Sequence, residues 1–246
     1  MGFGLTGHYY ECTSCRFLHT SHLDDPGTLE RVYSRPDTDC DPAAAWRQFC
    51  VAKRMRQLAL WRAFGWRYSP LNALDVGAGS GFLPAFLAHD LGWNAIGYEP
   101  YERPAYSPRL HAGTWEAVSA KAPFQVVTAS EVLEHLREPL PELRRIASVM
   151  DERRSFLYVT TGAYDPDACD QHWPYLATHT AQHCSFYSRE ALARVGEVIG
   201  ASLVLQVGRE AEWLFVRGSL GPIERVRLFG TAALVRATTP RRNRVG

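Results

Sequence analysis

The amino-acid sequence predicts an α/β fold: a doubly wound, mostly parallel sheet with an antiparallel last strand, preceded by an N-terminal helical and cysteine-containing cap. Three observations support this prediction. Segments with helical spacing separate four short apolar runs, at residues 71–76, 94–98, 124–128 and 155–160. The first run ends in a cluster of glycines that precedes a helical pattern. Near the C-terminus, residues 204–208 and 212–217 alternate as the strands of a hairpin do.

The stretch around the glycine cluster reads Ala-Leu-Asp-Val-Gly-Ala-Gly-Ser-Gly-Phe over residues 73–82. A strand that turns sharply into a helix needs glycine where a Cβ would collide with the turn or with a ligand. A dinucleotide-binding turn is spaced G-x-G-x-x-G, whereas this turn reads G-x-G-x-G and has Phe82 where the third glycine would stand. Asp75 would repel a pyrophosphate, but it can pair with an ammonium group. The alternative is a glycine-rich turn that binds no ligand.

This turn resembles motif I of the class I S-adenosylmethionine-dependent methyltransferases, which reads hydrophobic-D/E-V/I-G-x-G-x-G. The resemblance implies a Rossmann-like domain that binds S-adenosyl-L-methionine and releases S-adenosyl-L-homocysteine. It also implies that Asp75 faces the methionine amino end of the cofactor, directly or through water. The residues that it assigns to the backbone cradle are Gly77, Ala78, Gly79 and Gly81.

A second acid, Glu99, ends the next apolar run, where nucleoside-binding α/β folds place a carboxylate. One carboxylate accepts hydrogen bonds from both ribose hydroxyls, so we expect Glu99 and the adjoining Pro100 to bind the nucleoside. A solvated turn is the alternative. Tyr101 either covers the adenine or lies exposed in the loop. By position, Thr114 and Trp115 fall where the family's third strand ends and the adenine edge is read.

The segment over residues 124–139 is similar to the "FDvv…EVLEH…P" segment of the small-molecule branch of the same superfamily. We expect a buried strand over 124–128 and a helical turn over 131–137. The resemblance places Ser130 and Glu131 beside the methionine portion of the cofactor and His135 near the methyl-transfer pocket. Residues four apart share one helix face, so Glu131 and His135 are expected to be able to interact.

Aromatic residues and histidines crowd residues 172–188, a block that resembles the "W-x-Y…H-x-x-F-[FY]-S…L" stretch of this branch. A histidine of near-neutral pKa can take a proton from a hydroxyl acceptor. We therefore consider His183, and less strongly His179, as pocket residues, against a purely structural role. Ser188 is the expected N-cap of the next helix, with Ser185 as a competing cap.

Ahead of the glycine turn, a long helix is expected over residues 41–64, with Asp41 as its cap. Its apolar stripe is either core packing or also a helical cap over the cofactor. The residues of the stripe are Val51, Met55, Leu58 and Trp61.

The C-x-x-C pair Cys12 and Cys15 resembles half of a zinc unit that precedes some of these methyltransferase domains, but no upstream pair is present. His19 and His22 would complete a ligand set too cramped for a tetrahedral ion. We expect a hairpin with reduced thiols rather than bound zinc, and no catalytic metal.

The length of 246 residues and 46% hydrophobic content suit one α/β domain with appendages. We expect a cysteine-containing and helical segment over 1–65, the cofactor-binding methyltransferase domain over 66–218, and a C-terminal helix with a basic tail over 219–246. A net charge of +1 does not favour nucleic acid as a partner. With no apolar run long enough for a membrane span and no signal-peptide pattern, a cytoplasmic location is expected.

The expected function is O- or C-methylation of a small-molecule acceptor, such as a sugar, a quinone-like ring or a natural-product intermediate. His135 and His183 are the candidate base or acceptor-orienting residues. One alternative is a tRNA or protein methyltransferase that uses the Arg-rich C-terminus, although a solvated helix explains those charges too. The other alternative is a non-catalytic module that binds S-adenosylmethionine.

Overall fold

The computed structural model describes residues 8–21, 24, 27–28, 32, 42–60, 63–64, 70–100, 111–178, 180–208 and 211–238. Its strands are β1 (Tyr9–Glu11), β2 (Leu18–Thr20), β3 (Asn72–Val76), β4 (Asn94–Tyr98), β5 (His111–Ala112), β6 (Val126–Ser130), β7 (Arg154–Thr160), β8 (Ser185–Phe186), β9 (Ala201–Gln206) and β10 (Glu212–Gly218). Its helices are α2 (Pro42–Leu60), α3 (Phe82–Leu91), α4 (Trp115–Ser119), α5 (Pro139–Val149), α6 (Arg189–Ile199) and α7 (Pro222–Thr238), with short 3-10 helices η4 (Leu133–His135) and η5 (Pro174–Leu176).

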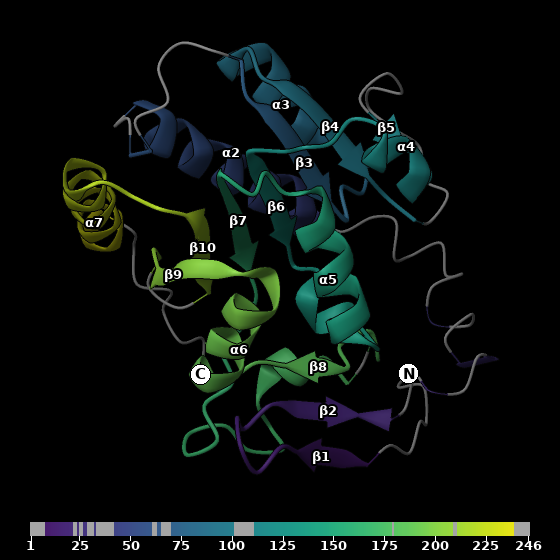
Figure 1. Cartoon of the computed structure of the whole chain (residues 1–246). Coiled ribbons are helices and arrows are strands. Elements are labelled where there is room, and N and C mark those ends of the chain that lie inside the picture. The colour runs from purple at the N-terminus through teal and green to yellow at the C-terminus, as the bar shows by residue number, and fades with distance from the viewer. Residues whose placement is uncertain are drawn as a thin grey trace.

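The main sheet has seven strands in the order β5-β4-β3-β6-β7-β10-β9 (Figure 1). The pairs β4–β5, β3–β4, β3–β6 and β6–β7 are parallel, whereas β10 is antiparallel to both β7 and β9. The prediction of a mostly parallel sheet with an antiparallel last strand is therefore confirmed. The chain starts the sheet at β3 and builds outward in both directions, which creates a topological switch point between β3 and β6.

Alternate residues of the strands face two separate cores. Val127 and Leu157 point into the core that α4, α5 and α6 cover, and Val126 and Phe156 point into the core beneath α2, α3 and α7. Both faces of the central strands are thus buried, which explains why these strands read as continuous apolar runs rather than as alternating patterns. The doubly wound arrangement follows from this burial on both faces.

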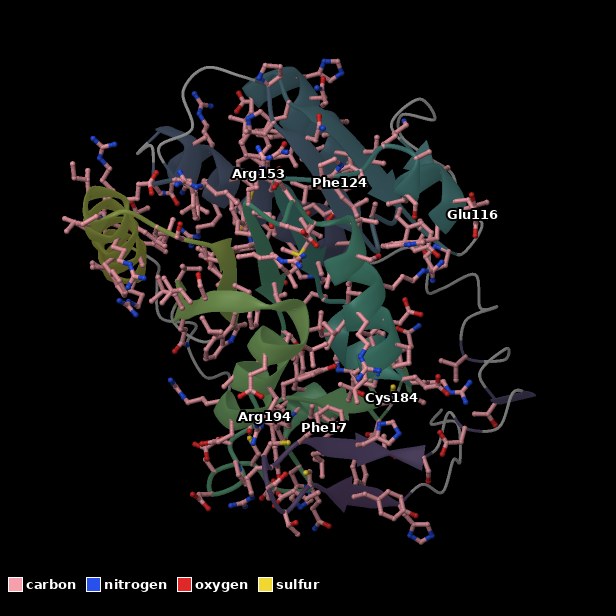
Figure 2. The ribbon with its side chains drawn as sticks, viewed as in Figure 1. Phe17, Glu116, Phe124, Arg153, Cys184 and Arg194 are labelled. Carbon is pink, nitrogen blue, oxygen red and sulfur yellow. The ribbon has the colours of Figure 1, made fainter. Side chains whose placement is uncertain are left out.

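The N-terminal hairpin β1–β2 forms a second, three-stranded sheet with β8, next to the carboxyl edge of the main sheet (Figure 1). Phe17 packs edge-on against Tyr187 at 5.1 Å between ring centroids. The Ser188 hydroxyl donates to the Cys15 carbonyl oxygen at 2.6 Å. Figure 2 shows Phe17 and Cys184 in this region, whereas Phe124 marks the opposite edge of the main sheet.

Several predicted helices are confirmed, and one is wrong. Ser188 caps α6 by accepting from the Ala191 backbone N–H at 3.1 Å. The expected helical turn over 131–137 is only the three-residue η4, because Glu131 has φ +54° and cannot continue a right-handed helix. Glu131 and His135 therefore do not share a helix face. No helix in the described part of the chain is long and apolar enough to cross a membrane.

Helix α2 begins and ends within the predicted range. Its residues Val51, Met55 and Leu58 are buried against the core beneath α2, α3 and α7, as the apolar stripe predicted. Trp61 and Asp41 lie outside the described residues.

Candidate functional site

The expected site residues gather at the carboxyl edge of the main sheet. The glycine turn follows β3, Glu99 follows β4, Glu131 follows β6 and Thr161 follows β7. In open α/β sheets, ligands bind outside this edge at the switch point, where the loops of neighbouring strands diverge. The order of the strands therefore brings together residues that are distant along the chain.

The glycine turn depends on backbone conformations that only glycine adopts without strain. Gly77, Gly79 and Gly81 have φ values of +68°, +54° and +76°. A Cβ on Gly77 would lie 2.6 Å from Val132 Cγ2, closer than any normal contact. Val132, in the loop after β6, thus packs directly against the turn. Among the described residues, the nearest atom to a Cβ added at Gly79 is Gln48 Nε2 at 3.8 Å. The turn leaves a backbone surface that a ligand can approach closely.

The two acids flank this turn. Asp75 is only 3% exposed and accepts a hydrogen bond from Thr128 Oγ1 at 2.7 Å. Burial raises the pKa of Asp75 to about 7, and the nearby Glu99 charge adds to the effect. Glu99 is also buried and accepts from the Gly79 backbone N–H at 2.9 Å. A ligand ammonium group would compensate the buried Asp75 carboxylate.

Gln48 of α2 is a site residue that we did not predict. Its Nε2 donates to the Ala78 carbonyl oxygen at 3.3 Å, so α2 covers the glycine turn. Its Oε1 is buried and accepts no hydrogen bond within the part of the chain that the structure describes. A buried acceptor without a donor is costly, and a ligand N–H or O–H would satisfy it. The apolar stripe indicated a helical cap, but it carried no signal for this polar position.

The nucleoside end of the expected site is only partly described. Thr114 caps α4 by accepting from the Ala117 backbone N–H at 3.3 Å. Trp115 is buried in the core, with the Arg145 guanidinium 4.5 Å from its ring centroid. Both residues thus have structural roles, and their contact with adenine stays a prediction. Pro100 is exposed beside Glu99. Tyr101 lies outside the described residues.

Ser130 and Glu131 are held by the end of β7. The hydroxyl groups of Ser130 and Thr160 lie 2.8 Å apart. The Glu131 backbone N–H donates to the Thr160 carbonyl oxygen at 2.9 Å, and its carboxylate accepts from Thr160 Oγ1 at 3.0 Å. These contacts fix Glu131 in its left-handed conformation. Burial, together with the neighbouring Glu134 charge, raises the pKa of Glu131 to about 7.

Glu134 is a second residue that sequence reasoning missed. It is completely buried and accepts hydrogen bonds from Tyr175 Oη at 2.5 Å and Thr161 Oγ1 at 3.0 Å. Burial raises its pKa. The residue lies inside the quoted EVLEH segment. In the expected helix, residues three apart share a face, so Glu134 would have lain near Glu131, but nothing in the segment marked this side chain as buried.

The structure brings His135 and His183 together. Their rings lie edge to face, with centroids 4.9 Å apart. His135 Nδ1 lies 3.1 Å from the Gln182 carbonyl oxygen, and His183 Nδ1 lies 2.6 Å from the Tyr175 carbonyl oxygen. A carbonyl oxygen accepts only, so each Nδ1 carries a proton and each neutral ring has its lone pair on Nε2. The pairing was not predictable from the spacing of these histidines.

An aromatic wall adjoins the two histidines. Tyr175 packs on His183 at 4.7 Å between centroids, and Trp173 lies 5.3 Å from Tyr175 and 5.8 Å from Phe186. The wall belongs to the loop that connects β7 to β8, and the β1–β2 hairpin packs behind it through the pairing of β2 with β8. His179 of the same loop lies outside the described residues.

The cysteine pair occupies the turn of the β1–β2 hairpin. Cys12 and Cys15 are free thiols, and a hydrogen bond from the Ser14 side chain is the largest cause that lowers the pKa of Cys12 to about 6. His19 Nδ1 faces Ser185 Oγ at 3.4 Å instead of the thiols, and His22 lies outside the described residues. Within the described ranges, no group of three potential ligands forms at this hairpin. The expected hairpin is confirmed, and nothing in its geometry supports zinc.

The basic C-terminal end forms helix α7, as expected, but residues 239–246 lie outside the described part of the chain. Arg236 donates to the Gln206 carbonyl oxygen at 3.1 Å, and Arg225 donates to the Leu220 carbonyl oxygen at 3.3 Å. These two arginines thus support the packing of α7 on its neighbours.

Comparisons with known proteins agree with this geometry. A family model described as a methyltransferase domain matches residues 46–206. No curated protein sequence matches the chain. The solved structure of the plantazolicin methyltransferase BpumL in complex with SAH is similar at 14% identity and a TM-score of 0.54, covering 86% of this chain and 89% of that one.

Two further solved structures are longer than this chain. PigF with SAH is similar at 15% identity and a TM-score of 0.50, covering 78% of this chain and 62% of that one. The mitomycin 7-O-methyltransferase MmcR is similar at 18% identity and a TM-score of 0.44, covering 65% of this chain and 52% of that one. The chain therefore spans between half and two thirds of the lengths of these two proteins.

Proposed function

Since this chain belongs to the methyltransferase domain family, we propose that it transfers the methyl group of S-adenosylmethionine to an oxygen or carbon of a small-molecule acceptor. The observation that carries this proposal is the pair of buried acids, Asp75 and Glu99, on either side of the glycine turn. The Asp75 carboxylate disfavours a pyrophosphate, and the positions of the two acids suit a ligand that has an ammonium group at one end and a ribose at the other.

The residues present fit S-adenosylmethionine on three counts. Asp75 is a buried carboxylate that an ammonium group would keep ionised. Glu99 can exchange its bond from the Gly79 N–H for bonds from the two ribose hydroxyls. Gln48 Oε1 is a buried acceptor in need of a donor beside the same turn. When bound, the cofactor supplies an electrophilic methyl group on its sulfonium.

The chain's own contribution is to position the acceptor and to remove its proton where the acceptor is a hydroxyl. The rings of His135 and His183 are oriented by their Nδ1 bonds to carbonyl oxygens, so the lone pair of a neutral ring is on Nε2 and can accept that proton. Trp173 and Tyr175 add flat apolar surface beside them. This lining favours a ring-containing acceptor such as a phenol, a quinone-like ring or a sugar face. An acceptor held in one orientation beside the methyl group loses less entropy on reaching the transition state than a freely diffusing one.

The test is methyl transfer from isotopically labelled S-adenosylmethionine to a panel of phenols, hydroquinones, hexoses and bulk tRNA. We expect labelled product with at least one ring-containing small molecule. For that acceptor, His183→Asn should lower kcat by about 10²–10⁴-fold, the usual contribution of a general base, while His172→Asn, an exposed control in the same loop, leaves it unchanged. Label in tRNA alone, or cofactor binding without turnover on any acceptor, would contradict the proposal.

A further inference from the structure

Three side chains at the carboxyl edge bring potential metal ligands together. A carboxylate oxygen of Glu134 and a ring nitrogen of both His135 and His183 all lie within 4.8 Å of one another. Ligands held at about 2.1 Å from one ion are about 3.0–3.5 Å apart, so side-chain shifts of about 1 Å bring this set onto an ion. We infer that these three residues bind one divalent transition-metal ion.

The two imidazoles are already oriented as metal-binding histidines are. In such sites, the ring nitrogen that does not ligate donates its N–H to a carbonyl oxygen or a carboxylate, which fixes the tautomer and the ring plane. His135 makes this bond to the Gln182 carbonyl oxygen and His183 makes it to the Tyr175 carbonyl oxygen. Both acceptors belong to the backbone of one loop, so that loop sets both rings at once.

Glu134 supplies the charge that such an ion needs. Its two oxygens are held separately, Oε1 by Tyr175 Oη and Oε2 by Thr161 Oγ1. Each carboxylate oxygen has two lone pairs, so both oxygens keep capacity for a further ligand. Glu134 is 0% exposed, and the ion pairs found among the described residues, such as Arg54–Glu212 and Arg154–Glu224, do not include it. A buried carboxylate is stabilised when it is paired with a cation or coordinates a metal.

The donor set indicates the class of ion. Two imidazoles and one carboxylate suit Zn²⁺, Fe²⁺, Co²⁺ or Mn²⁺, whereas Mg²⁺ and Ca²⁺ prefer sites made of oxygen ligands. From the sequence we expected no catalytic metal, and we considered metal ligands only at the cysteine pair.

The position of the cluster gives such an ion a role, and that role rests on the proposed function. Glu134 and His135 lie in η4, directly after Val132, whose side chain packs on Gly77 of the glycine turn. An acceptor oxygen bound to the ion would therefore lie near the place where the methyl group is delivered. With the ion bound, Nε2 of each histidine is a ligand and not the base, and an acceptor hydroxyl on the ion would give up its proton to water more readily. This favours acceptors with an oxygen that can bind a metal, such as a phenol or an enol.

The inference is tested on the untagged, full-length protein after removal of metal with a chelator. Co²⁺ chloride is titrated while the visible absorption of protein-bound cobalt is recorded, and the same titration is followed by calorimetry. His135→Asn and His183→Asn are the informative variants, because the asparagine amide can still donate to the carbonyl oxygen that Nδ1 now contacts. His172→Asn is the matched control, and Glu134→Gln replaces either variant that fails to fold by circular dichroism.

We expect one Co²⁺ per chain, with an affinity that falls at least 10-fold in each cluster variant and stays unchanged in the control. Absence of a saturable cobalt band, or equal binding by the cluster variants, would overturn the inference. Calorimetry with S-adenosylhomocysteine on the same metal-free samples separates the two proposals. Cofactor binding without cobalt binding refutes only the metal site, whereas cobalt binding without cofactor binding refutes only the proposed function.

Discussion

Asp75→Asn should stabilise the cofactor-free protein and lower its affinity for the cofactor. The buried carboxylate has a pKa of about 7, against an ordinary value of 3.8. Because the pKa is higher in the folded than in the unfolded chain, ionisation of Asp75 opposes folding. This opposing contribution is absent below pH 4 or so, grows between pH 4 and 7, and is fully present above pH 7.

The difference between the two pKa values corresponds to about 4 kcal/mol of lost stability at pH 7, about 2 kcal/mol at pH 5 and less than about 1 kcal/mol at pH 4. Asparagine removes this penalty and can still accept from Thr128 Oγ1. Its buried amide N–H groups gain no acceptor, which costs about 1–3 kcal/mol of that gain. We therefore expect a net gain of about 1–3 kcal/mol at pH 7, and no gain at pH 4.

The assay is thermal unfolding of wild type and Asp75→Asn between pH 4 and 8, with exposed Asp167→Asn as the control. Each kcal/mol corresponds to about 2–4 °C in Tm for a chain of this size. S-adenosylhomocysteine should bind the variant about 10- to 100-fold more weakly, because a charge-assisted bond of about 1.5–3 kcal/mol is lost. A stability difference that does not grow with pH, or unchanged cofactor affinity, would refute the reasoning about Asp75.

Three further predictions concern the turn, α6 and the cap over the turn. Gly77→Ala should lower the free energy of unfolding, measured with denaturant, by about 2–4 kcal/mol. Alanine is strained in the left-handed conformation, and its Cβ would clash with Val132 Cγ2. In a Val132→Ala background, Gly77→Ala should lower the free energy of unfolding clearly less. An equal decrease in both backgrounds would show that the clash is not the cause. Ser188→Ala should lower stability by about 1–2 kcal/mol through the cap of α6, with S-adenosylhomocysteine affinity unchanged in calorimetry. Gln48→Leu should weaken cofactor binding about 10-fold and change Tm little. Leucine loses the 3.3 Å bond from Nε2 to the Ala78 carbonyl oxygen, but it also removes the buried Oε1, which has no donor among the described residues. A large loss of Tm would show that the residue is structural.

The parts of the fold that the sequence predicted are those encoded by local patterns. The glycine turn, the apolar strands and the Ser188 cap each depend on neighbours in the chain. The turn and the cap form where expected, whereas β6 (Val126–Ser130) and β9 (Ala201–Gln206) are displaced by two or three residues from the expected 124–128 and 204–208. The prediction of a helical turn over 131–137 was wrong because Thr160, on a different strand, holds Glu131 in a left-handed conformation. Residue pattern alone does not contain that contact.

The residues of the candidate site likewise fall into those that a local pattern predicts and those that only the tertiary fold brings together. Asp75 and Glu99 could be predicted because each ends a strand beside the glycine turn. Gln48 and Glu134 could not, because their roles arise from packing between segments that are distant along the chain. A single glutamine on a helix, or a buried glutamate within EVLEH, has no spacing that marks it. The closeness of His135 to His183 likewise required the fold of the β7–β8 loop.

The most direct test of the central claim is calorimetric titration of the purified protein with S-adenosylhomocysteine and with NAD, repeated on Glu99→Ala. Micromolar binding of S-adenosylhomocysteine, weakened at least 10-fold in Glu99→Ala, with no binding of NAD, is the result that this account predicts. Folded protein that binds NAD, or that binds neither ligand, would contradict it.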